Sequence, residues 1–422
     1  MPSDAVRSRS RGLIVAASCA IALFAAWRIV SLAIADFYAD SDPARALQWR
    51  PEHPDALLLL AEKNVAGRNF DAAEALAKRA LAANPLDGRA YRVLADAASA
   101  RGERERQQAL IALAVQHAPR DIAARAWAAQ IALERGDAAA AVAHYDRILR
   151  VAPGAQAKVF PVLSGLAATP GAREAMVSRL AEQPPWRTEL LGYFASTAPA
   201  ADDLPPVFEE LRARGGLSPV ENAALVGRFV RDRRWDQAFV AWAGGLSPAQ
   251  LSALGTPVNR GFEEQAPPSG PFEWNIGRVS GVDADIRPSP DGPGHALRIE
   301  FQGRRSAFRD VRQLLLLPPG RGYQLKWRSR FDELQASRGL RWTVTCADGT
   351  AGVILATEPS TGSSPWRKHA AAFDVPADCP AQWLTLELDA RIAAETQAMG
   401  TAWFDDVEVV SRDTDRVDLP KS

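Results

Sequence analysis

The sequence has no net charge, since Lys and Arg together number 50 and Asp and Glu also number 50. Nucleic-acid-binding proteins normally carry a basic excess on at least one domain, so this balance argues against that class. Histidine is scarce, with five residues scattered along 422 positions, and none is spaced to complete a metal-binding cluster. Apolar residues make up 47% of the chain, which is ample for packed cores and excludes wholesale disorder.

The sequence also lacks the short motifs of the common enzyme classes. It contains no nucleophile elbow, phosphate loop, zinc-protease helix motif or dinucleotide fingerprint. Two pairs of adjacent carboxylates, at 263–264 and 405–406, have the residue types of a glycoside hydrolase. Adjacent residues on a strand point to opposite faces, so neither pair makes a good acid–base couple. We therefore expect a protein without catalytic activity.

One long apolar run is present, at residues 12–35, where Arg28 is the only charged side chain. As a helix, these 24 residues would extend roughly 36 Å, enough to cross a hydrocarbon core of about 30 Å. Three arginines precede the run and predict that residues 1–11 form a cytoplasmic tail. We expect a single-pass transmembrane signal anchor in the inner membrane, with the C-terminal bulk of the chain in the periplasm.

Two other interpretations of the apolar run stay open. Residues 33–35 resemble a signal-peptidase site, although the run is longer than the roughly 7–15 residues of a signal core. Cys19 suggests a lipoprotein, although almost no apolar run precedes it. Under each interpretation the bulk of the chain is exported. The abundance of Ala and Arg suits a GC-rich bacterial gene, so we expect a bacterium with two membranes.

Four prolines mark a regular repeat in the first half of the chain. Pro51, Pro85, Pro119 and Pro153 follow one another at intervals of 34 residues, each after a pair of apolar residues. A fixed period of roughly 20–50 residues is the signature of stacked structural repeats. Each unit has the pattern of two amphipathic helices and a turn, with proline ending the second helix. The sequence therefore predicts an α-helical solenoid over residues 40–155.

These repeats resemble the tetratricopeptide repeat (TPR) family. Besides the prolines, the residues that carry the resemblance are Leu57, Leu60, Ala61, Phe70, Ala73, Ala80, Leu81, Tyr91, Leu94, Ala95, Gly102, Ala114, Gly136, Ala141 and Tyr145. The tryptophan usual near each repeat start is missing, and Gln107 stands where a small residue is usual. The resemblance implies a concave groove that binds a protein partner. The alternative, that the helices only space an outer domain from the membrane, stays open.

Residues 156–256 keep a helical pattern but lose the 34-residue period, because prolines cut the segment into short helices. One hairpin around Trp235 and Trp242 matches the spacing of the earlier repeats. We expect a degenerate, irregular continuation of the solenoid. Trp186, Trp235 and Trp242 are expected to pack in the core or at interfaces rather than bind a ligand.

Apolar and polar residues begin to alternate after Pro257. Apolar side chains occupy every second position at 323–327, 340–344 and 384–388. A period of two indicates strands with one buried face. About eight such strands, separated by turn signals, predict an all-β antiparallel sandwich over residues 258–411, most simply a jelly roll. Residues 412–422 form a tail in this scheme.

The β region resembles carbohydrate-binding modules with a galactose-binding-like fold. The resemblance is carried by Asn259–Glu263 followed by Trp274, by Leu317–Gly320, and by Trp403–Val407. The resemblance implies the fold and a sugar-binding role, and the alternative is a domain that only assists assembly.

The same resemblance implies a structural calcium ion held by Glu263 and an aspartate of the closing motif, Asp405 or Asp406. Hard carboxylate oxygens suit that cation. The alternative is that the two aspartates only cap a strand end and accept backbone N–H bonds. No other cofactor or metal is expected.

Sugar binding requires exposed aromatic rings, because a pyranose stacks its C–H face on an indole. The candidates are Trp274, Trp366 and Trp383, and Trp366 is the best because it lies in a polar loop beside an arginine and a histidine. Packing in the core or at the rim is the alternative for each of them. Trp327, Trp342 and Trp403 fall within alternating runs, so we expect these three to lie in the core.

Cys346 and Cys379 are the only cysteines outside the apolar run. An even pair within one small domain favours a disulfide in an oxidising compartment. The bond would join the end of one strand to the loop before residues 383–388. Two buried free thiols are the alternative.

Together these features predict a non-catalytic scaffold or adaptor of the cell envelope. Its helical repeats would recruit a protein partner, and its sandwich would engage a polysaccharide or a second partner. The combination resembles accessory proteins of exopolysaccharide or O-antigen polymerisation and export. The second hypothesis is a lectin-like glycan receptor whose repeats are only a stalk.

Overall fold

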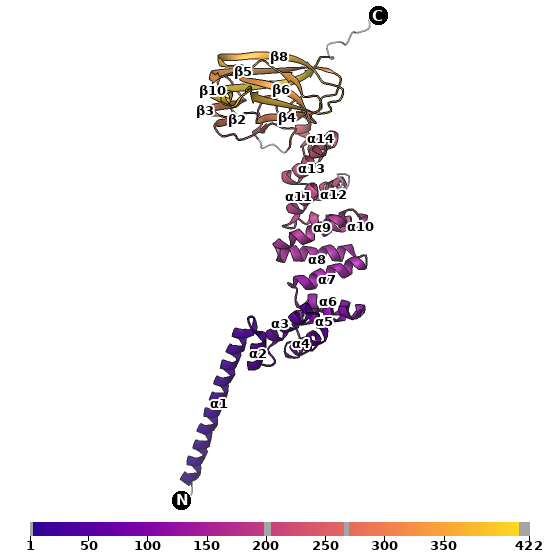
Figure 1. Ribbon diagram of the computed structural model, residues 1–422, viewed down its shortest axis with the longest axis vertical. Coiled ribbons are helices and arrows are strands. Elements are labelled where there is room, and N and C mark those ends of the chain that lie inside the picture. Colours follow the sequence, from indigo (N-terminus) through magenta and orange to yellow (C-terminus); the bar gives the residue numbers. More distant parts are fainter. Residues whose placement is uncertain (1–2, 198–203, 266–269, 413–422) are drawn as a thin grey trace. The chain divides into compact units, whose positions relative to one another are not determined.

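The computed structural model describes residues 3–197, 204–265 and 270–412. These residues belong to two compact units, residues 1–187 and residues 188–422. Helices make up the first unit, and the second contains further helices followed by two β-sheets (Figure 1). The predicted fold class, a helical solenoid followed by an all-β sandwich, is confirmed.

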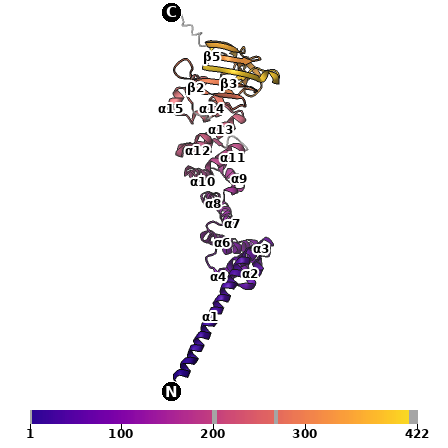
Figure 2. The same cartoon turned by 90° about the vertical axis from the view of Figure 1, so that its left-hand side faces the viewer.

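The helices of the first unit begin with a long one that projects from its neighbours (Figure 2). They are α1 (Ser3–Ala39), α2 (Pro43–Trp49), α3 (Pro54–Ala66), α4 (Phe70–Ala83), α5 (Gly88–Ala100), α6 (Arg104–His117), α7 (Ile122–Glu134), α8 (Ala138–Val151), α9 (Gln156–Ala167) and α10 (Pro170–Ala181). The chain continues through α11 (Arg187–Thr197), α12 (Leu204–Gly215), α13 (Pro219–Arg231), α14 (Trp235–Ala243) and α15 (Pro248–Ser252).

The predicted apolar run lies inside α1. Residues 17–39 of this helix form a stretch of 23 residues with a mean hydropathy of 1.9. By length and composition, this stretch is long and apolar enough to cross a membrane. Large apolar side chains on α1 are exposed, among them Leu23 at 72% and Phe24 at 65%. Exposed residues of this kind need an apolar partner or a lipid environment.

Helices α3 to α8 form three successive hairpins, as the proline spacing predicts. Gly102 and Gly136 both have φ of +74°, a left-handed conformation that allows the tight turn between the two helices of a hairpin. Alanines fill the crossings, and Ala61, Ala73 and Ala95 are almost completely buried. Small side chains there allow the helix backbones to approach closely.

The irregular helices also follow the prediction in outline. Helices α13 and α14 form the expected hairpin, and Trp186, Trp235 and Trp242 are buried. Within the second unit, Trp242 packs against Phe239 and Phe272 at ring separations of 5.4 Å. The α14 helix is therefore joined by aromatic packing to the segment that leads into the first sheet.

Over the described residues from 270 to 412, the sandwich contains ten strands. They are β1 (Asn275–Ile276), β2 (Val282–Pro288), β3 (His295–Arg305), β4 (Val311–Leu315), β5 (Gly322–Ala336), β6 (Leu340–Cys346), β7 (Val353–Ala356), β8 (Gly362–Asp374), β9 (Gln382–Leu388) and β10 (Gln397–Ser411). Sheet A has the order β1-β4-β9-β6-β7 and sheet B the order β2-β3-β10-β5-β8, with antiparallel neighbours throughout. The alternating runs at 323–327, 340–344 and 384–388 fall in β5, β6 and β9, as expected.

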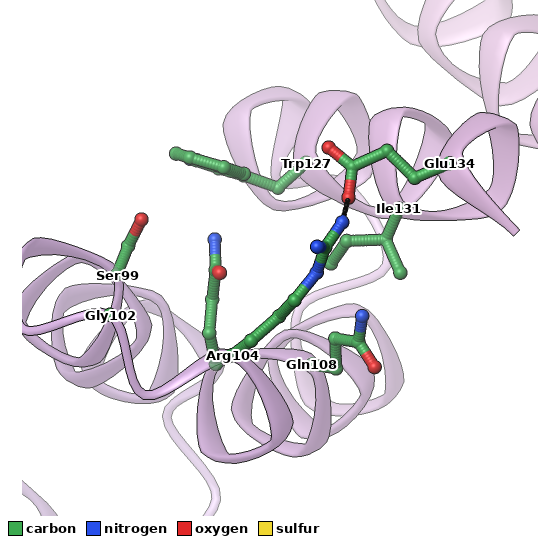
Figure 3. Close-up of a pocket in the computed structure, with 8 residues that line it drawn as sticks. Ser99, Gly102, Arg104, Gln108, Trp127, Ile131 and Glu134 are labelled. Carbon is green, nitrogen blue, oxygen red and sulfur yellow. Dashed lines mark hydrogen bonds and ion pairs between the residues drawn. The ribbon is translucent and has the colours of Figure 1, made fainter.

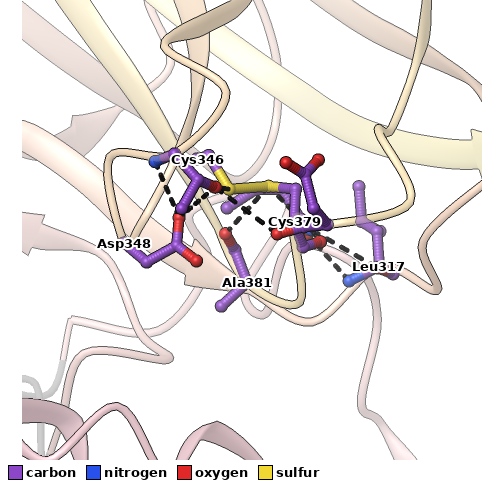
Figure 4. The surroundings of a disulfide bond; sticks show 8 residues. Leu317, Cys346, Asp348, Cys379 and Ala381 are labelled. Atoms are coloured by element: carbon purple, nitrogen blue, oxygen red, sulfur yellow. Dashed lines mark hydrogen bonds between the residues drawn. A yellow bond between two sulfur atoms is a disulfide. The ribbon is translucent and has the colours of Figure 1, made fainter.

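A disulfide joins Cys346 at the end of β6 to Cys379 in the loop before β9, which confirms the predicted pairing (Figure 4). The two Cα atoms lie 5.6 Å apart, and both cysteines are buried. Next to the bond, the Gln382 side chain donates to the Cys379 carbonyl at 2.8 Å and accepts from the Leu317 N–H at 2.9 Å. The bond and these contacts fix three loops at one end of the sandwich.

Candidate functional site

The face of sheet B that points away from the core concentrates the side chains that could bind a ligand. Leu325 in β5, and Ala402 and Phe404 in β10, are buried in the core, so their neighbours along each strand point outward. We call this surface the outer face of sheet B. Its central residues are Arg298, Lys326, Arg328, Arg330, Trp366, Lys368, Trp403, Asp405 and Glu408.

Trp403 lies near the middle of this face, half-buried between two arginines. It pairs with Arg298 of β3 on one side and with Arg330 of β5 on the other. The prediction that Trp403 belongs to the core is wrong. Aromatic residues occupy both faces of β10 here, and a period of two does not tell which face is buried.

Trp366 lies on the same face, in strand β8 and not in the predicted loop. Its ring is half-buried, and the guanidinium carbon of Arg328 lies 5.3 Å from the ring centroid, a cation–π contact. Pro365 precedes it, which is tolerated because β8 is an edge strand of the sheet. Trp366 and Trp403 therefore flank Arg328 and Arg330 on one surface.

Arg328 also binds the two aspartates of the closing motif. Its guanidinium donates to Asp405 at 2.5 Å and lies 2.7 Å from an Asp406 carboxylate oxygen. Burial raises the pKa of Asp405, and the Asp406 carboxylate acts in the same direction, whereas a backbone N–H and Arg328 oppose the rise. A short arginine–carboxylate pair of this kind holds the guanidinium in one orientation.

The carboxylates predicted to hold calcium do not fit a cation site in this structure. Asp405 and Asp406 both face the Arg328 guanidinium, which already supplies a positive charge. Glu263 instead accepts hydrogen bonds from the His295 backbone N–H at 3.2 and 3.3 Å. Over the described parts of the chain, no three Asp, Glu, His or Cys residues form a metal-binding group.

The two other candidate tryptophans lie elsewhere. Trp274 is only 5% exposed and packs in the core against Phe262 and Trp342, so it does not offer a stacking surface. Its indole N–H donates to the Asn259 carbonyl at 3.1 Å, which satisfies the buried donor. Trp383 is half-buried on sheet A under Arg312, whose guanidinium carbon lies 4.7 Å from the ring centroid. It shares no site with Trp366, which belongs to the other sheet.

His369, which the sequence places beside Trp366, points to the opposite side of β8. Its ring stacks on Trp327 at 5.1 Å, and its Nε2 lies 3.0 Å from the Ser329 hydroxyl. Burial and the nearby Arg367 lower the pKa of His369. Ser329 is only 1% exposed, so this serine–histidine pair does not present a nucleophile to solvent.

In the helical repeats, two arginines of α5 are surrounded by carboxylates. Arg89 pairs with Asp55 at 2.5 Å and with Asp87 at 2.9 Å. Arg92 is paired with Glu62 of α3, Asp96 of α5 and Asp121 at the start of α7. These charges therefore neutralise one another between neighbouring repeats.

A hollow of about 280 Å³ lies between the α5–α6 turn and α7 (Figure 3). Trp127 and Glu134 of α7 line one side and Arg104 and Gln108 of α6 the other, and Arg104 forms an ion pair with Glu134. The sequence pattern did not identify this hollow. Its signal is Trp127, an aromatic residue at a position where the repeat pattern has none.

A family model matches part of the helical repeats. Residues 44–97 match the model of the tetratricopeptide repeat. No curated protein matches the sequence.

Several solved structures are similar in part. A family 4 carbohydrate-binding module is 18% identical, with 36% of this chain and 98% of that chain covered and a TM-score of 0.28. The xylan-binding domain of Paenibacillus barcinonensis Xyn10C is 14% identical, covering 36% and 91% of the two chains with a TM-score of 0.26. Pseudomonas aeruginosa pilF is also 14% identical, covering 51% and 89% with a TM-score of 0.26.

The chain thus carries tetratricopeptide-type helical repeats, followed by an antiparallel β-sandwich that resembles carbohydrate-binding modules.

Proposed function

We propose that this protein is a non-catalytic adaptor of the bacterial envelope, anchored in the inner membrane by α1. Its repeats bind a protein partner in the periplasm, and its sandwich binds a glycan. The exposed apolar side chains of α1 support the anchor. A role in exopolysaccharide or O-antigen polymerisation or export is the cellular process that we propose for such an adaptor.

The observation that carries the glycan proposal is the arrangement of the outer face of sheet B. Trp366 and Trp403 offer indole surface for the C–H faces of sugar rings. Between them, Arg328 and Arg330 are held in place by carboxylates, at 2.5 Å for Arg328 and 2.9 Å for Arg330. Oriented arginines and carboxylates are suitable partners for the paired hydroxyls of a sugar, because donors and acceptors lie side by side.

The test is affinity electrophoresis of the detergent-solubilised full chain through gels that contain different polysaccharides. Trp403→Ala and Trp366→Ala should each weaken binding by roughly tenfold or more, the effect of removing a central aromatic contact. Trp383→Ala is the matched control, since Trp383 is also half-buried beneath an arginine but lies on sheet A. Equal losses in all three variants, or no binding by the unmodified chain, would contradict the proposal.

A lectin-like receptor with a helical stalk is the second candidate, and one observation favours it. Arg89 and Arg92 of the repeats are already paired with carboxylates of the same chain, which leaves fewer charges for a peptide. Crosslinking from a single cysteine introduced at the exposed position Gln130 in α7 would distinguish the adaptor from the receptor. Capture of one envelope protein supports the adaptor, whereas glycan binding without any captured protein supports the receptor.

A further inference from the structure

The outer face of sheet B contains a second feature, a hollow of about 520 Å³ near the β8 edge. This volume falls within the roughly 300–1,000 Å³ usual for small-ligand sites. The small side chain of exposed Ala370 in β8 contributes to the hollow. It is bordered by Arg260, Lys326, Arg328, Lys368, Ala370, Asp406 and Glu408, and also by Trp327 and His369, whose side chains point to the other face of the sheet.

Positive charge exceeds negative charge around this hollow. Four Arg and Lys side chains line it against two carboxylates. Arg260 pairs with Glu408 at 2.8 Å, and Arg328 is shared between Asp405 and Asp406. The arginines are therefore compensated, and the excess charge comes from the two lysines.

Lys326 and Lys368 have no carboxylate partner in the described part of the chain, and both are exposed. In the register of β5 with β8, Lys326 lies opposite Ala370 and Arg328 lies opposite Lys368. The two lysines are therefore diagonal neighbours, whose backbones are roughly 7–8 Å apart. Two flexible ammonium groups at this separation can converge on one anion above the hollow.

Charge also varies across the sheet. The β2 edge presents Asp283 and Asp285, which Arg298 binds, whereas the β8 edge presents Lys368 without a partner. A ligand that lies across the strands from Trp403 to Ala370 therefore contacts paired charges at its Trp403 end and unpaired positive charge at its Ala370 end. This gradient favours one orientation for a ligand with an anionic substituent.

We propose that the hollow beside Lys326 and Lys368 binds an anionic substituent of a glycan, a carboxylate or a phosphate carried on a sugar ring. This inference rests on the proposed glycan-binding function and names the chemical class of its ligand. The neighbouring Trp366 supplies stacking, and the two lysines supply selectivity for acidic over neutral sugars. Because the lysines are exposed, their contribution decreases with increasing salt concentration.

The experiment compares four polymers against the detergent-solubilised full chain. They are polygalacturonate, the same polymer with its carboxylates reduced to alcohols, a phosphorylated mannan, and polyphosphate, which has charge but no sugar. Polygalacturonate or the phosphomannan should bind best, and the preference between those two identifies the anionic group. The carboxyl-reduced polymer should bind roughly tenfold more weakly, consistent with the loss of two exposed ion pairs.

The double variant Lys326→Gln and Lys368→Gln should lose this roughly tenfold preference while retaining the weaker binding of the neutral polymer. Lys158→Gln, an exposed lysine of α9, is the matched control and should bind like the unmodified chain. Thermal unfolding of the variants checks that the sandwich is intact.

Three outcomes would overturn the inference. Equal binding of the acidic and reduced polymers, abolished by Trp366→Ala, would sustain glycan binding but remove the anionic preference. Polyphosphate binding as tight as that of the acidic glycans would mean non-specific attraction between charges. The absence of binding to any polymer would contradict both the proposed function and this inference.

Discussion

Several charged side chains in the repeats pair with residues about one repeat away, whereas some in the sandwich pair between segments that are much farther apart in the sequence. Arg101 binds Asp71 over 30 residues and Arg106 binds Glu74 over 32. In the sandwich, Arg328 binds Asp405 over 77 residues and Arg260 binds Glu408 over 148. The first pattern follows the 34-residue period, and the second follows the order of strands in the sheets.

This difference has consequences for stability. When each repeat contacts only its neighbours, the free energy of unfolding is a sum of local terms and the ends can open separately. When strands far apart in the sequence pair, as β10 does with β3 and β5, loss of one strand removes support from the others in the sheet. We therefore expect graded responses in the repeats and a single cooperative transition in the sandwich.

The largest effect is expected for Trp342→Ala in the sandwich core. Trp342 is 1% exposed and contacts Trp274 and Phe404 at ring separations of 5.7 Å. Its removal should lower the free energy of unfolding of the sandwich by about 3–5 kcal/mol. Hydrogen–deuterium exchange at increasing denaturant concentration, followed in peptides from the strands, should report this loss, while the midpoint for peptides from α3 to α8 should not change.

The control for this substitution is Leu57→Ala in α3, where the side chain is fully buried. It should shift the transition of peptides from α3 to α8 and leave the transition of the strands unchanged. Movement of both transitions in either variant would show that the two regions do not unfold independently.

A smaller effect is expected from loss of the disulfide. Cys346 and Cys379 are separated by 33 residues, and replacement of both by serine should lower the free energy of unfolding of the sandwich by about 2–4 kcal/mol. A reducing agent should have the same effect on the unmodified chain. Cys19→Ser should have none, since that cysteine lies in α1. A stable sandwich after reduction would argue that packing alone holds the three loops.

The smallest effect concerns Glu74, which links two repeats. Arg101, Lys78 and Arg106 all bind its carboxylate and lower its pKa from 4.5 to about 2. Because the pKa is lower in the folded state, the ionised carboxylate of Glu74 stabilises the repeats above pH 4.5. This contribution to the free energy of unfolding is lost as the pH falls from 4.5 toward 2.

The variant Glu74→Gln should destabilise the repeats by about 1–2 kcal/mol at neutral pH and flatten that acid dependence. The measurement is the helical unfolding midpoint between pH 7 and pH 2. Glu52→Gln removes a single exposed ion pair with Arg79 and should change stability by less than about 0.5 kcal/mol. The same acid dependence in both variants would show that Glu74 is not its source.

The sequence was informative where one periodic signal determines the structure. The spacing from Pro51 to Pro153 predicted the helical hairpins, and the alternation around Leu325 predicted β5. The cysteine pair was predicted from number and compartment alone. For the hairpins and for β5, the residues that define the element lie close together in the chain or repeat at a fixed interval.

The candidate site depended on contacts that no local pattern contains. No local pattern distinguishes Trp274 from Trp403. Trp274 packs in the core, whereas Trp403 lies on the outer face of sheet B. The pairing of Arg328 with Asp405 and Asp406 depends on the register of β5 against β10, which includes a bulge. The expectation that these aspartates bind calcium came from the resemblance to carbohydrate-binding modules, which carries no information on this pairing.

The packing of Trp242 against Phe272 determines where the protein can be cut for study. A fragment that starts at Pro257 would discard α14 and leave Phe272, now 2% exposed, without its aromatic cover. Newly uncovered apolar surface of this kind promotes aggregation. A recombinant boundary ahead of α11, near Arg187, retains that cover and is the better choice for crystallisation or binding assays.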